Sequence, residues 1–564
     1  MKIKHVTEQF SISDQLVPED LATLAESGVD ILICNRPDGE AAEQIDFAEL
    51  AEAAESHGIR TFHIPFTSGH LDAEITREFG ECLEDGKRIH AFCRTGNRSF
   101  SAYVAAQARQ GAALNDLLEL AKKVDIDVSE PLKPYFPEIP MDKTKPANTS
   151  SGAAKASFDI VIVGAGSGGI AAASSIKKRN KRLSIALIDP ASDHYYQPGW
   201  TMVGGGVFDA PSTRRSMGSL IPSGVKWIQQ AVAGFDPKAN EVQLDNGDSV
   251  HYQNLIVAAG LKLNWSGIDG LEQTLGKNGV TSNYRYDLAP YTFKLVSELK
   301  QGKALFTQPP MPIKCAGAPQ KAMYLSCDHW LKKGVLKDID VHFLNAGGVL
   351  FGVSDYVPAL QSYVDRYNAN VHFSHNLTAI DGENRVATFK AADSDEPVSM
   401  EFDMIHVCPP QCAPDVVASS ELADEGGWLD VDQFTLRHKK FDNVWGLGDV
   451  MNTPNAKTMA AVRKQVPVVA SNLVASLDGR EVNLGYDGYG SCPLTVENGK
   501  IVLAEFGYGG KLLPSFPAWM LNGTKATRSA WILKKQILPA VYWHAMLKGH
   551  EWLAGPKPLK DVQN

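Results

Sequence analysis

Residues 158–169 read Phe158-Asp159-Ile160-Val161-Ile162-Val163-Gly164-Ala165-Gly166-Ser167-Gly168-Gly169, and they predict the architecture of most of the 564-residue chain. Its apolar half predicts a buried parallel strand, and the small residues after it predict a helix. The first glycine permits a tight turn, the second lets a pyrophosphate approach, and the third lets helix and strand pack closely. A second apolar run ends on Asp189, which is placed to hold a ribose hydroxyl. The stretch predicts a dinucleotide site formed by Gly164, Gly166, Ser167, Gly168, Gly169 and Asp189.

Two later segments complete the pattern of a flavoprotein. Residues 255–260 read as a buried strand that ends in glycine, and residues 444–449 read as a strand followed by an acidic residue. This set resembles the flavoproteins with two dinucleotide-binding domains. The resemblance implies that FAD is the cofactor, that Asp449 binds its ribityl chain and that Lys457 stabilises the anionic reduced flavin. The alternative for Lys457 is a solvated surface lysine. The cofactor contacts implied in these segments are Ala259, Gly260, Gly448, Asp449 and Lys457.

A nicotinamide site is not expected in the second half of this unit. Where a second glycine motif should lie, the chain carries Pro309-Pro310. Proline offers no N–H to a pyrophosphate and fixes φ, so this turn makes a poor phosphate site. The chain also has no cysteine between Cys93 and Cys315, which excludes the arrangement of pyridine-nucleotide dithiol reductases. We therefore expect the reduced flavin to pass its electrons to an acceptor other than a nicotinamide. The alternative is an NAD(P)H-dependent disulfide or persulfide reductase.

Two cysteines stand beside residues that restrict the backbone: Cys315 is followed by Ala316-Gly317-Ala318-Pro319, and Cys492 precedes a proline. Taken alone, two buried structural cysteines would be the commoner interpretation. Together with other motifs they resemble the sulfide:quinone oxidoreductases, particularly the branch that includes the mitochondrial enzyme. The matching stretches are residues 194–201, 315–321, 349–353, 446–449 and 486–494.

That resemblance covers roughly residues 157–556 and implies a mechanism. Cys315 and Cys492 would form a redox-active disulfide beside the flavin, and Gln197 would contact the cofactor. Hydrosulfide attacks a disulfide to give one persulfide and one thiolate. The family suggests that Cys492 carries the persulfide and that Cys315 faces the flavin. A thiol such as glutathione, or sulfite, would then remove the sulfane sulfur, and a ubiquinone-type quinone would take the electrons.

A membrane quinone is dissolved in the lipid bilayer, so we expect the protein to contact the bilayer. It has no run of about twenty apolar residues, so no segment is expected to span it. Residues 531–548 mix Trp, Tyr and aliphatic residues with Lys, which suits an amphipathic helix in the interface. The alternative is a helix that packs on the core. The family favours the membrane, and we expect a peripheral protein on the cytoplasmic face of the inner membrane.

Composition excludes several other classes. Eight cysteines in 564 residues do not indicate a disulfide-rich secreted protein, and residues 1–10 lack the apolar core of a secretory signal. The net charge of −10 argues against nucleic acid as a partner. Cys408 and Cys412 lack partners at metal-site spacing, so no metal is expected. A homodimer is left open. We read as structural the cysteines Cys34, Cys82, Cys327, Cys408 and Cys412.

The chain is longer than one flavoprotein of this type, and the additional residues precede the flavoprotein part. Strands at 30–34, 60–64 and 88–92 alternate with helical stretches at 18–26, 47–56 and 73–84, which indicates a small α/β domain with a parallel sheet. The third strand ends in Cys93-Arg94-Thr95-Gly96-Asn97-Arg98, and a helix is expected from about Phe100 to Gln110. A cysteine on such a strand-to-helix turn meets converging backbone N–H groups, which favour a nucleophilic thiolate.

The front domain resembles the phosphatase-fold family called beta-lactamase-hydrolase-like, through residues 35–40 and the Cys93 loop. Tyrosine phosphatases place five residues between Cys and Arg, whereas Cys93 and Arg98 enclose four. With Arg94 directly after the cysteine, the loop is more similar to that of rhodaneses. We therefore favour a sulfurtransferase over a phosphatase, with Arg94 and Arg98 stabilising the thiolate; Asp38 is only a candidate phosphatase acid. A regulatory binding domain is a third alternative.

The expected fold class is thus α/β throughout, and the chain is divided into four parts. These are a phosphatase-like, parallel-sheet sulfurtransferase domain, a linker, a two-Rossmann-domain flavoprotein of the disulfide-reductase type, and a membrane-contacting C-terminal segment. Their expected bounds are 1–135, 136–156, 157–525 and 526–564.

Overall fold

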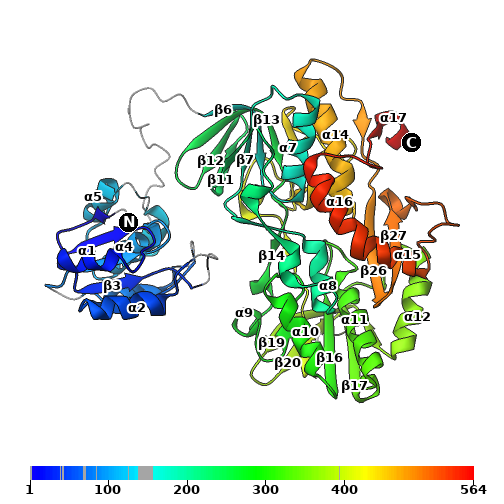
Figure 1. Cartoon of the computed structure of the whole chain (residues 1–564), viewed down its shortest axis with the longest axis horizontal. Coiled ribbons are helices and arrows are strands. Elements are labelled where there is room, and N and C mark those ends of the chain that lie inside the picture. Colours follow the sequence, from blue (N-terminus) through cyan, green and yellow to red (C-terminus); the bar gives the residue numbers. More distant parts are fainter. Residues whose placement is uncertain are drawn as a thin grey trace. The chain divides into compact units, whose positions relative to one another are not determined.

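The computed structural model of the chain describes all residues except 1–2, 39, 41–43, 68–70, 84–85, 125, 127, 137–155, 393, 395 and 564 (Figure 1). The chain divides into two compact units, Met1–Ala153 and Ala154–Asn564. The linker expected at 136–156 lies almost wholly outside the described residues. The four sequence-based domain bounds stay predictions.

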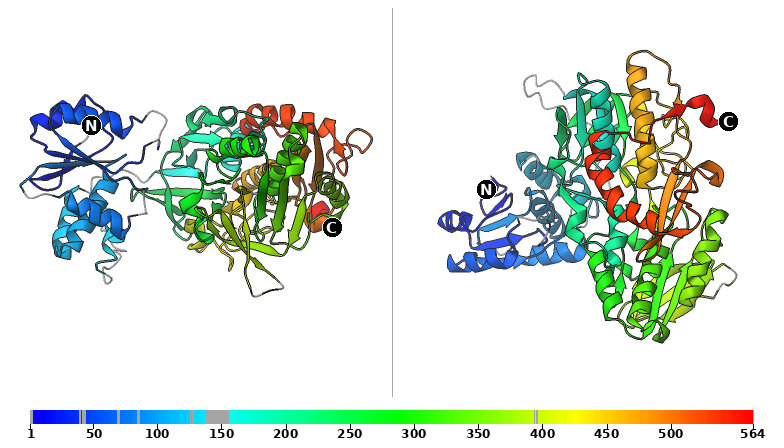
Figure 2. Two further views of the ribbon diagram at one scale, coloured as in Figure 1. Left: turned by 90° about the horizontal axis from the view of Figure 1, so that it is seen from below. Right: turned by 45° about the vertical axis from the view of Figure 1, so that its right-hand side comes forward.

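The front unit is a five-stranded sheet with helices packed on both faces (Figure 2). Side chains of β3 alternate between two cores, with Ile31 and Ile33 on one face and Leu32 and Cys34 on the other, as a strand buried on both sides requires. The three expected parallel strands are present, and α4 begins at Asn97, earlier than expected. The strands, in sheet order, are β1 (Lys4–His5), β2 (Phe10–Ser13), β5 (Ile89–Phe92), β3 (Ile31–Cys34) and β4 (Arg60–His63), and the helices are α1 (Asp20–Glu26), α2 (Phe47–Ser56), α3 (Ala73–Glu81), α4 (Asn97–Arg109), α5 (Leu114–Val124) and α6 (Ser129–Leu132).

The second unit begins with the expected dinucleotide-binding sheet. The apolar run at 158–163 forms a central strand, β6, and the glycine loop leads from it into α7. A long helix, α14, packs beside α7 (Figure 1). The sheet comprises β10 (Val225–Ile228), β7 (Ile185–Ile188), β6 (Ser157–Val163), β13 (Ser249–Val257), β12 (Glu241–Leu244), β11 (Val232–Asp236) and β24 (Val444–Gly446), which pairs with β13; α7 spans Ser167–Arg179 and α14 spans Met459–Leu477.

A second parallel sheet follows within the same unit, as the fold class predicts. Its central strand β16 pairs with β17 along its whole length on one side and with β22 at three residues on the other. The strand runs into the Pro309-Pro310 turn, and α11 begins just after Cys315. The sheet order is β15 (Val280–Thr281), β22 (Met404–His406), β16 (Gly302–Gln308), β17 (Ile339–Asn345) and β18 (Asn370–Phe373), with α10 (Leu288–Glu298), α11 (Ala318–Lys333), η6 (Ser354–Tyr356) and α12 (Val357–Tyr367).

The C-terminal part returns to cover both sheets. A hairpin of β26 (Gly490–Glu497) and β27 (Lys500–Phe506) packs on α11, with β28 (Ala526–Thr527) at its edge. The chain then continues through α15 (Arg528–Ile532), a π-helical turn (Leu533–Ile537) and α16 (Leu538–His544), which lies beside α7 and α14 in Figure 1 and in the right-hand view of Figure 2. Among the described residues, no helix has the length and apolar character needed to cross a membrane.

Candidate active site

The two sequence-predicted cysteines of the flavoprotein meet although 177 residues separate them. Cys315 lies before α11 and Cys492 lies on β26, with their sulfur atoms 3.6 Å apart. An S–S bond is about 2.05 Å long, so the two cysteines are not bonded to each other in this structure. Only glycine fits at position 317, because a Cβ there would fall 2.7 Å from the sulfur of Cys492. Cys315 itself has a φ of +51°, a conformation uncommon outside glycine.

The electrostatics of the pair are asymmetric. A hydrogen bond from Cys492, followed by the positive charge of Lys321, holds the pKa of Cys315 well below its usual range. The Lys321 ammonium donates to the Cys315 sulfur at 3.0 Å, and the side chain is only 2 % exposed. The same hydrogen bond, together with burial, raises the pKa of Cys492. The reduced pair is therefore a Cys315 thiolate beside a Cys492 thiol.

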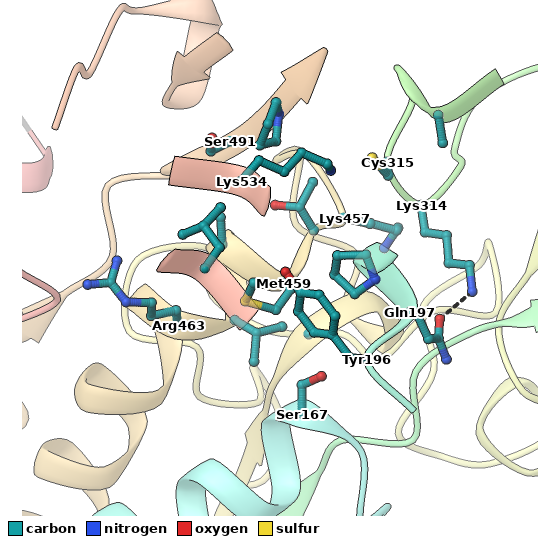
Figure 3. A pocket seen from close by; sticks show the side chains of 18 of the residues that line it. Ser167, Tyr196, Gln197, Lys314, Cys315, Lys457, Met459, Arg463, Ser491 and Lys534 are labelled. Atoms are coloured by element: carbon teal, nitrogen blue, oxygen red, sulfur yellow. Dashed lines mark hydrogen bonds between the residues drawn. The ribbon is translucent and has the colours of Figure 1, made fainter. Parts of the chain in front are cut away.

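A second buried lysine faces the pair from the C-terminal segment. Lys534 lies in the π-helical turn, is 5 % exposed and points toward Cys315 (Figure 3). Burial, and then the charge of Lys321, lowers the pKa of Lys534 to about 7. The sequence analysis missed both lysines. The position of Lys321 six residues after Cys315 was a usable signal, whereas nothing in the sequence distinguished Lys534 from the exposed lysines near it.

The cysteine pair opens into a cavity that also reaches the glycine loop. Cys315 lines this cavity from one side and Ser491, next to Cys492, from another. Of the expected cofactor contacts, eight line it: Gly166, Ser167, Gly168, Gln197, Gly260, Gly448, Asp449 and Lys457. The remaining four, Gly164, Gly169, Asp189 and Ala259, are not among its lining residues.

Gly164 and Gly169 act by close packing. Gly164 has a φ of +98°, and a Cβ there would lie 2.5 Å from the carbonyl oxygen of Ala258; a Cβ on Gly169 would lie 1.9 Å from the carbonyl oxygen of Gly164. Asp189 accepts hydrogen bonds from the backbone N–H groups of Ala165 and Ala191 at 2.7 and 2.9 Å. In this structure its carboxylate therefore holds the backbone of the glycine loop in place through hydrogen bonds.

The cavity fits the polar parts of FAD. One carboxyl oxygen of Asp449 is buried without a hydrogen-bond partner, and burial raises the pKa of this group. A buried acceptor without a partner is costly, and ribityl hydroxyls at this position would satisfy it. The open backbone at Gly166 and Gly168, at the start of α7, suits a pyrophosphate. The roles of these residues toward the cofactor stay predictions.

Lys457 is a buried residue and not a solvated surface lysine. Its ammonium donates to the carbonyl oxygens of Asp449 and Met451 at 2.8 and 2.6 Å and lies 4.1 Å from the centre of the Trp428 ring. Burial lowers its pKa to about 8. Gln197 accepts a hydrogen bond from Lys314 at 2.6 Å at the cavity wall (Figure 3). Their roles toward the cofactor stay predictions.

The C-terminal segment combines a packed face with an exposed one. Tyr542 is buried, and its hydroxyl lies 3.0 Å from Ser167 Oγ and 2.6 Å from His194 Nε2, against the glycine loop. On its other side the segment contributes apolar side chains to the cavity, and nearby Trp519 and Trp552 are 86 % and 60 % exposed. These cavity-lining residues are Leu533, Ile537, Leu538, Val541, Trp552 and Leu553.

The front unit places its cysteine as the sequence predicts, at the end of β5. Cys93 is buried, and the backbone N–H of Gly96 donates to its sulfur at 3.2 Å. Arg98 donates to the carboxylate of Glu40 at 2.8 Å and to the carbonyl oxygen of Phe66 at 2.7 Å, while Arg94 is exposed. The carboxylate of Asp38 accepts a hydrogen bond from the backbone of Phe47. The functions of these side chains stay predictions.

Two family models match the chain. The beta-lactamase hydrolase-like protein, phosphatase-like domain, matches residues 2–110, and pyridine nucleotide-disulphide oxidoreductase matches residues 158–316. Both agree with the resemblances seen in the sequence, and the second, a flavoprotein family, supports FAD as the cofactor.

Curated relatives extend the match across the second unit. A mitochondrial sulfide:quinone oxidoreductase from Dictyostelium discoideum is 40 % identical over 393 residues, covering 69 % of this chain and 86 % of the relative. One from Mus musculus is 38 % identical over 410 residues, covering 72 % and 90 %. The sulfide:quinone oxidoreductase structure from Aquifex aeolicus shares the fold, with a TM-score of 0.60 and 18 % identity over 71 % of this chain and 92 % of that one. This chain, whose cofactor is FAD, therefore belongs to the sulfide:quinone oxidoreductase family.

Proposed function

We propose that the second unit oxidises sulfide to sulfane sulfur on the Cys315–Cys492 pair and passes the electrons through FAD to a quinone. The observation that supports this most directly is the pair itself: two sulfur atoms 3.6 Å apart at a cavity that fits FAD, with Lys321 at 3.0 Å. FAD, when bound, takes up the two electrons released as the thiols join and passes them to the quinone.

The asymmetry of the pair supports one direction of attack. Hydrosulfide attacks the Cys492 sulfur of the disulfide, so that a new S–S bond forms on Cys492 and the old bond breaks to leave a Cys315 thiolate. Cys315 suits this leaving role because Lys321 and the Cys492 hydrogen bond stabilise its anion. A nucleophilic acceptor, either a thiolate or sulfite, then attacks the outer sulfur of the Cys492 persulfide. The S–S bond to Cys492 breaks, Cys492 is left as a thiolate, and the acceptor departs as a persulfide or as thiosulfate. Glutathione or sulfite is the proposed acceptor class.

The quinone would enter from a membrane surface. The C-terminal segment lines the cavity with apolar side chains, and some of its apolar side chains, including those of Ile532 and Trp552, are exposed. Such a rim suits a peripheral protein that rests on lipid and admits a hydrophobic substrate. We propose that this rim contacts the cytoplasmic face of the inner membrane.

The front unit is proposed to receive the sulfane sulfur on Cys93 and to transfer it to a thiol. A backbone N–H already donates to this sulfur, and the loop between Cys93 and Arg98 is one residue shorter than that of tyrosine phosphatases. A small loop suits one sulfur atom better than a tetrahedral phosphate. A phosphatase or a regulatory binder is the alternative.

Anaerobic titration of the full-length protein tests these assignments. Sulfide should bleach the FAD absorbance, and a ubiquinone analogue should restore it. Cys315→Ser and Cys492→Ser should each retain FAD but lose sulfide-dependent quinone reduction by orders of magnitude; near-normal turnover in either would contradict the mechanism. Cys93→Ser should leave bleaching intact and change the yield of glutathione persulfide. Cys93-dependent hydrolysis of aryl phosphates without sulfur transfer would instead support the phosphatase.

A further inference from the structure

A buried carboxyl group, Glu505, lies in the apolar part of the cavity wall. It is 4 % exposed, and it lines the cavity together with Leu503 of the same strand. On the paired strand β26, Ser491 stands opposite Glu505 in register, whereas Cys492 stands opposite Ala504. Because side chains alternate along a strand, Glu505 and Cys492 lie on opposite faces of the hairpin. A carboxyl group is costly to bury unless it is hydrogen-bonded, so this position needs an explanation.

Glu505 is the inner end of a chain of hydroxyl groups. The Tyr489 hydroxyl donates to one carboxyl oxygen of Glu505 at 2.7 Å and lies 3.2 Å from the hydroxyl oxygen of Ser515. The backbone N–H of Ser515 donates to the other carboxyl oxygen at 3.2 Å. Ser515 is exposed, whereas Tyr489 and Glu505 are buried. Three groups with exchangeable protons, those of Ser515, Tyr489 and Glu505, therefore form a chain from solvent to the cavity wall.

The charged groups that face this carboxyl come from α14. Arg463 and Lys464 act on it electrostatically, and the Lys464 ammonium lies 5.4 Å from the centre of the Tyr489 ring. From η6, the hydroxyl of Tyr356 donates to the backbone carbonyl of Glu505 at 3.0 Å. Burial raises the pKa of Tyr489. Tyr489 therefore keeps its proton at neutral pH and can pass one on only as it receives another.

Quinone reduction needs protons, and the quinone is proposed to enter at the apolar rim of the cavity. In the net reaction, hydrogen sulfide, a thiol and a quinone give a persulfide of that thiol and a quinol. Two protons leave the sulfur compounds and two enter the quinone, one at each oxygen. Among the described residues that line the cavity, the carboxylic acids are Asp449 and Glu505. Asp449 lies at the expected ribityl position, which leaves Glu505 for the quinone.

We propose that Glu505 donates one proton to the quinone and is reprotonated from solvent through Tyr489 and Ser515. This assignment rests on the quinone reduction proposed above. The reduced FAD would supply the electron pair and the proton for one quinone oxygen. For the second oxygen, the carboxyl O–H bond of Glu505 breaks and a new O–H bond forms on the quinone. Tyr489 then donates a proton to Glu505 and takes one from Ser515.

The test separates proton delivery from electron transfer. Wild type, Glu505→Gln and Tyr489→Phe, each loaded with FAD, are reduced with dithionite and reoxidised either by a short-chain ubiquinone or by ferricyanide, which accepts electrons without protons. Glu505→Gln keeps the size of the side chain and an acceptor for Ser515. We expect reoxidation by the quinone to slow by about a hundredfold in Glu505→Gln, with a smaller loss in Tyr489→Phe, and reoxidation by ferricyanide to stay unchanged. Tyr508→Phe, which removes a hydroxyl that donates to the Gln433 carbonyl, is the matched control and should resemble wild type.

An independent readout is the infrared difference spectrum between the oxidised and reduced protein. A carboxyl C=O band that changes on reduction should be present in wild type, absent in Glu505→Gln and shifted in Tyr489→Phe. The proposal is wrong if Glu505→Gln reoxidises with quinone at the wild-type rate, or if ferricyanide slows equally, since that would indicate a structural defect. Dithionite bypasses sulfide, so a failure of sulfide to bleach wild-type FAD would count against the proposed function alone.

Discussion

Replacing Lys321 with methionine should raise the pKa of the Cys315 thiol. The ammonium lies 3.0 Å from the sulfur, and an effective dielectric constant of about 20 gives about 5 kcal/mol for unit charges at that separation. One pKa unit corresponds to about 1.4 kcal/mol, so the upper bound is about four units. The hydrogen bond from Cys492, which contributes most to the lowered pKa, remains in the variant, as does the charge of Lys534. The pKa of Cys315 should therefore rise within that bound, without returning fully to that of an isolated thiol.

The assay is the pH dependence of Cys315 alkylation by iodoacetamide in the reduced protein, followed by mass spectrometry. Because its pKa is lowered, wild-type Cys315 should stay a reactive thiolate through neutral pH and lose reactivity only in acid. In Lys321→Met the loss should begin at higher pH, and sulfide-dependent turnover near neutrality should fall with it. Lys333→Met, on the exposed side of the same helix, is the control. Coincident alkylation curves for Lys321→Met and wild type would refute the reasoning.

Three further outcomes are expected. Gly317→Ala should separate the sulfurs, since the added Cβ would lie 2.7 Å from Cys492, and should lower both turnover and, by roughly 1–3 kcal/mol, the free energy of unfolding in denaturant titrations; unchanged values would contradict the packing argument. Asp449→Ala should lower the FAD content of the purified protein, measured by absorbance, because the ribityl chain loses its acceptor; full occupancy would count against that role. NADH and NADPH should leave the FAD spectrum unchanged, because Pro309 and Pro310 offer no N–H to a pyrophosphate; rapid bleaching by either would overturn this interpretation.

Local signals predicted the first dinucleotide-binding sheet well. The apolar run, the glycines and the small-residue helix act over about thirty residues, and the structure forms β6, the loop and α7 there. Short or irregular elements were harder. The strands β1 and β2 of the front unit span two and four residues and were not expected, because so short a run carries almost no periodicity.

Site residues could be predicted where the local sequence around them is distinctive. They could not be predicted where only long-range packing brings an ordinary residue into the site. Cys315, Cys492 and Asp449 stand in distinctive local sequence, and the structure brings them to one cavity or its edge. Lys534 and Glu505 stand in ordinary sequence, and only long-range packing buries them. Asp189 shows the converse: its position after the strand was predicted, but in this structure its hydrogen bonds go to the glycine-loop backbone.

The β26–β27 hairpin explains how one cavity can serve two chemistries. One face of the hairpin carries Cys492 and Leu494 and packs toward Gly317 and α11, where Lys321 stabilises sulfur anions. The other face carries Ser491 and Glu505 and borders the apolar part of the cavity. A hydrated anion and a lipid-soluble quinone need opposite environments, and strand alternation supplies both within a few ångströms. Substitutions on one face should therefore alter one half-reaction and leave the other measurable, which is what lets the two proposals be tested separately.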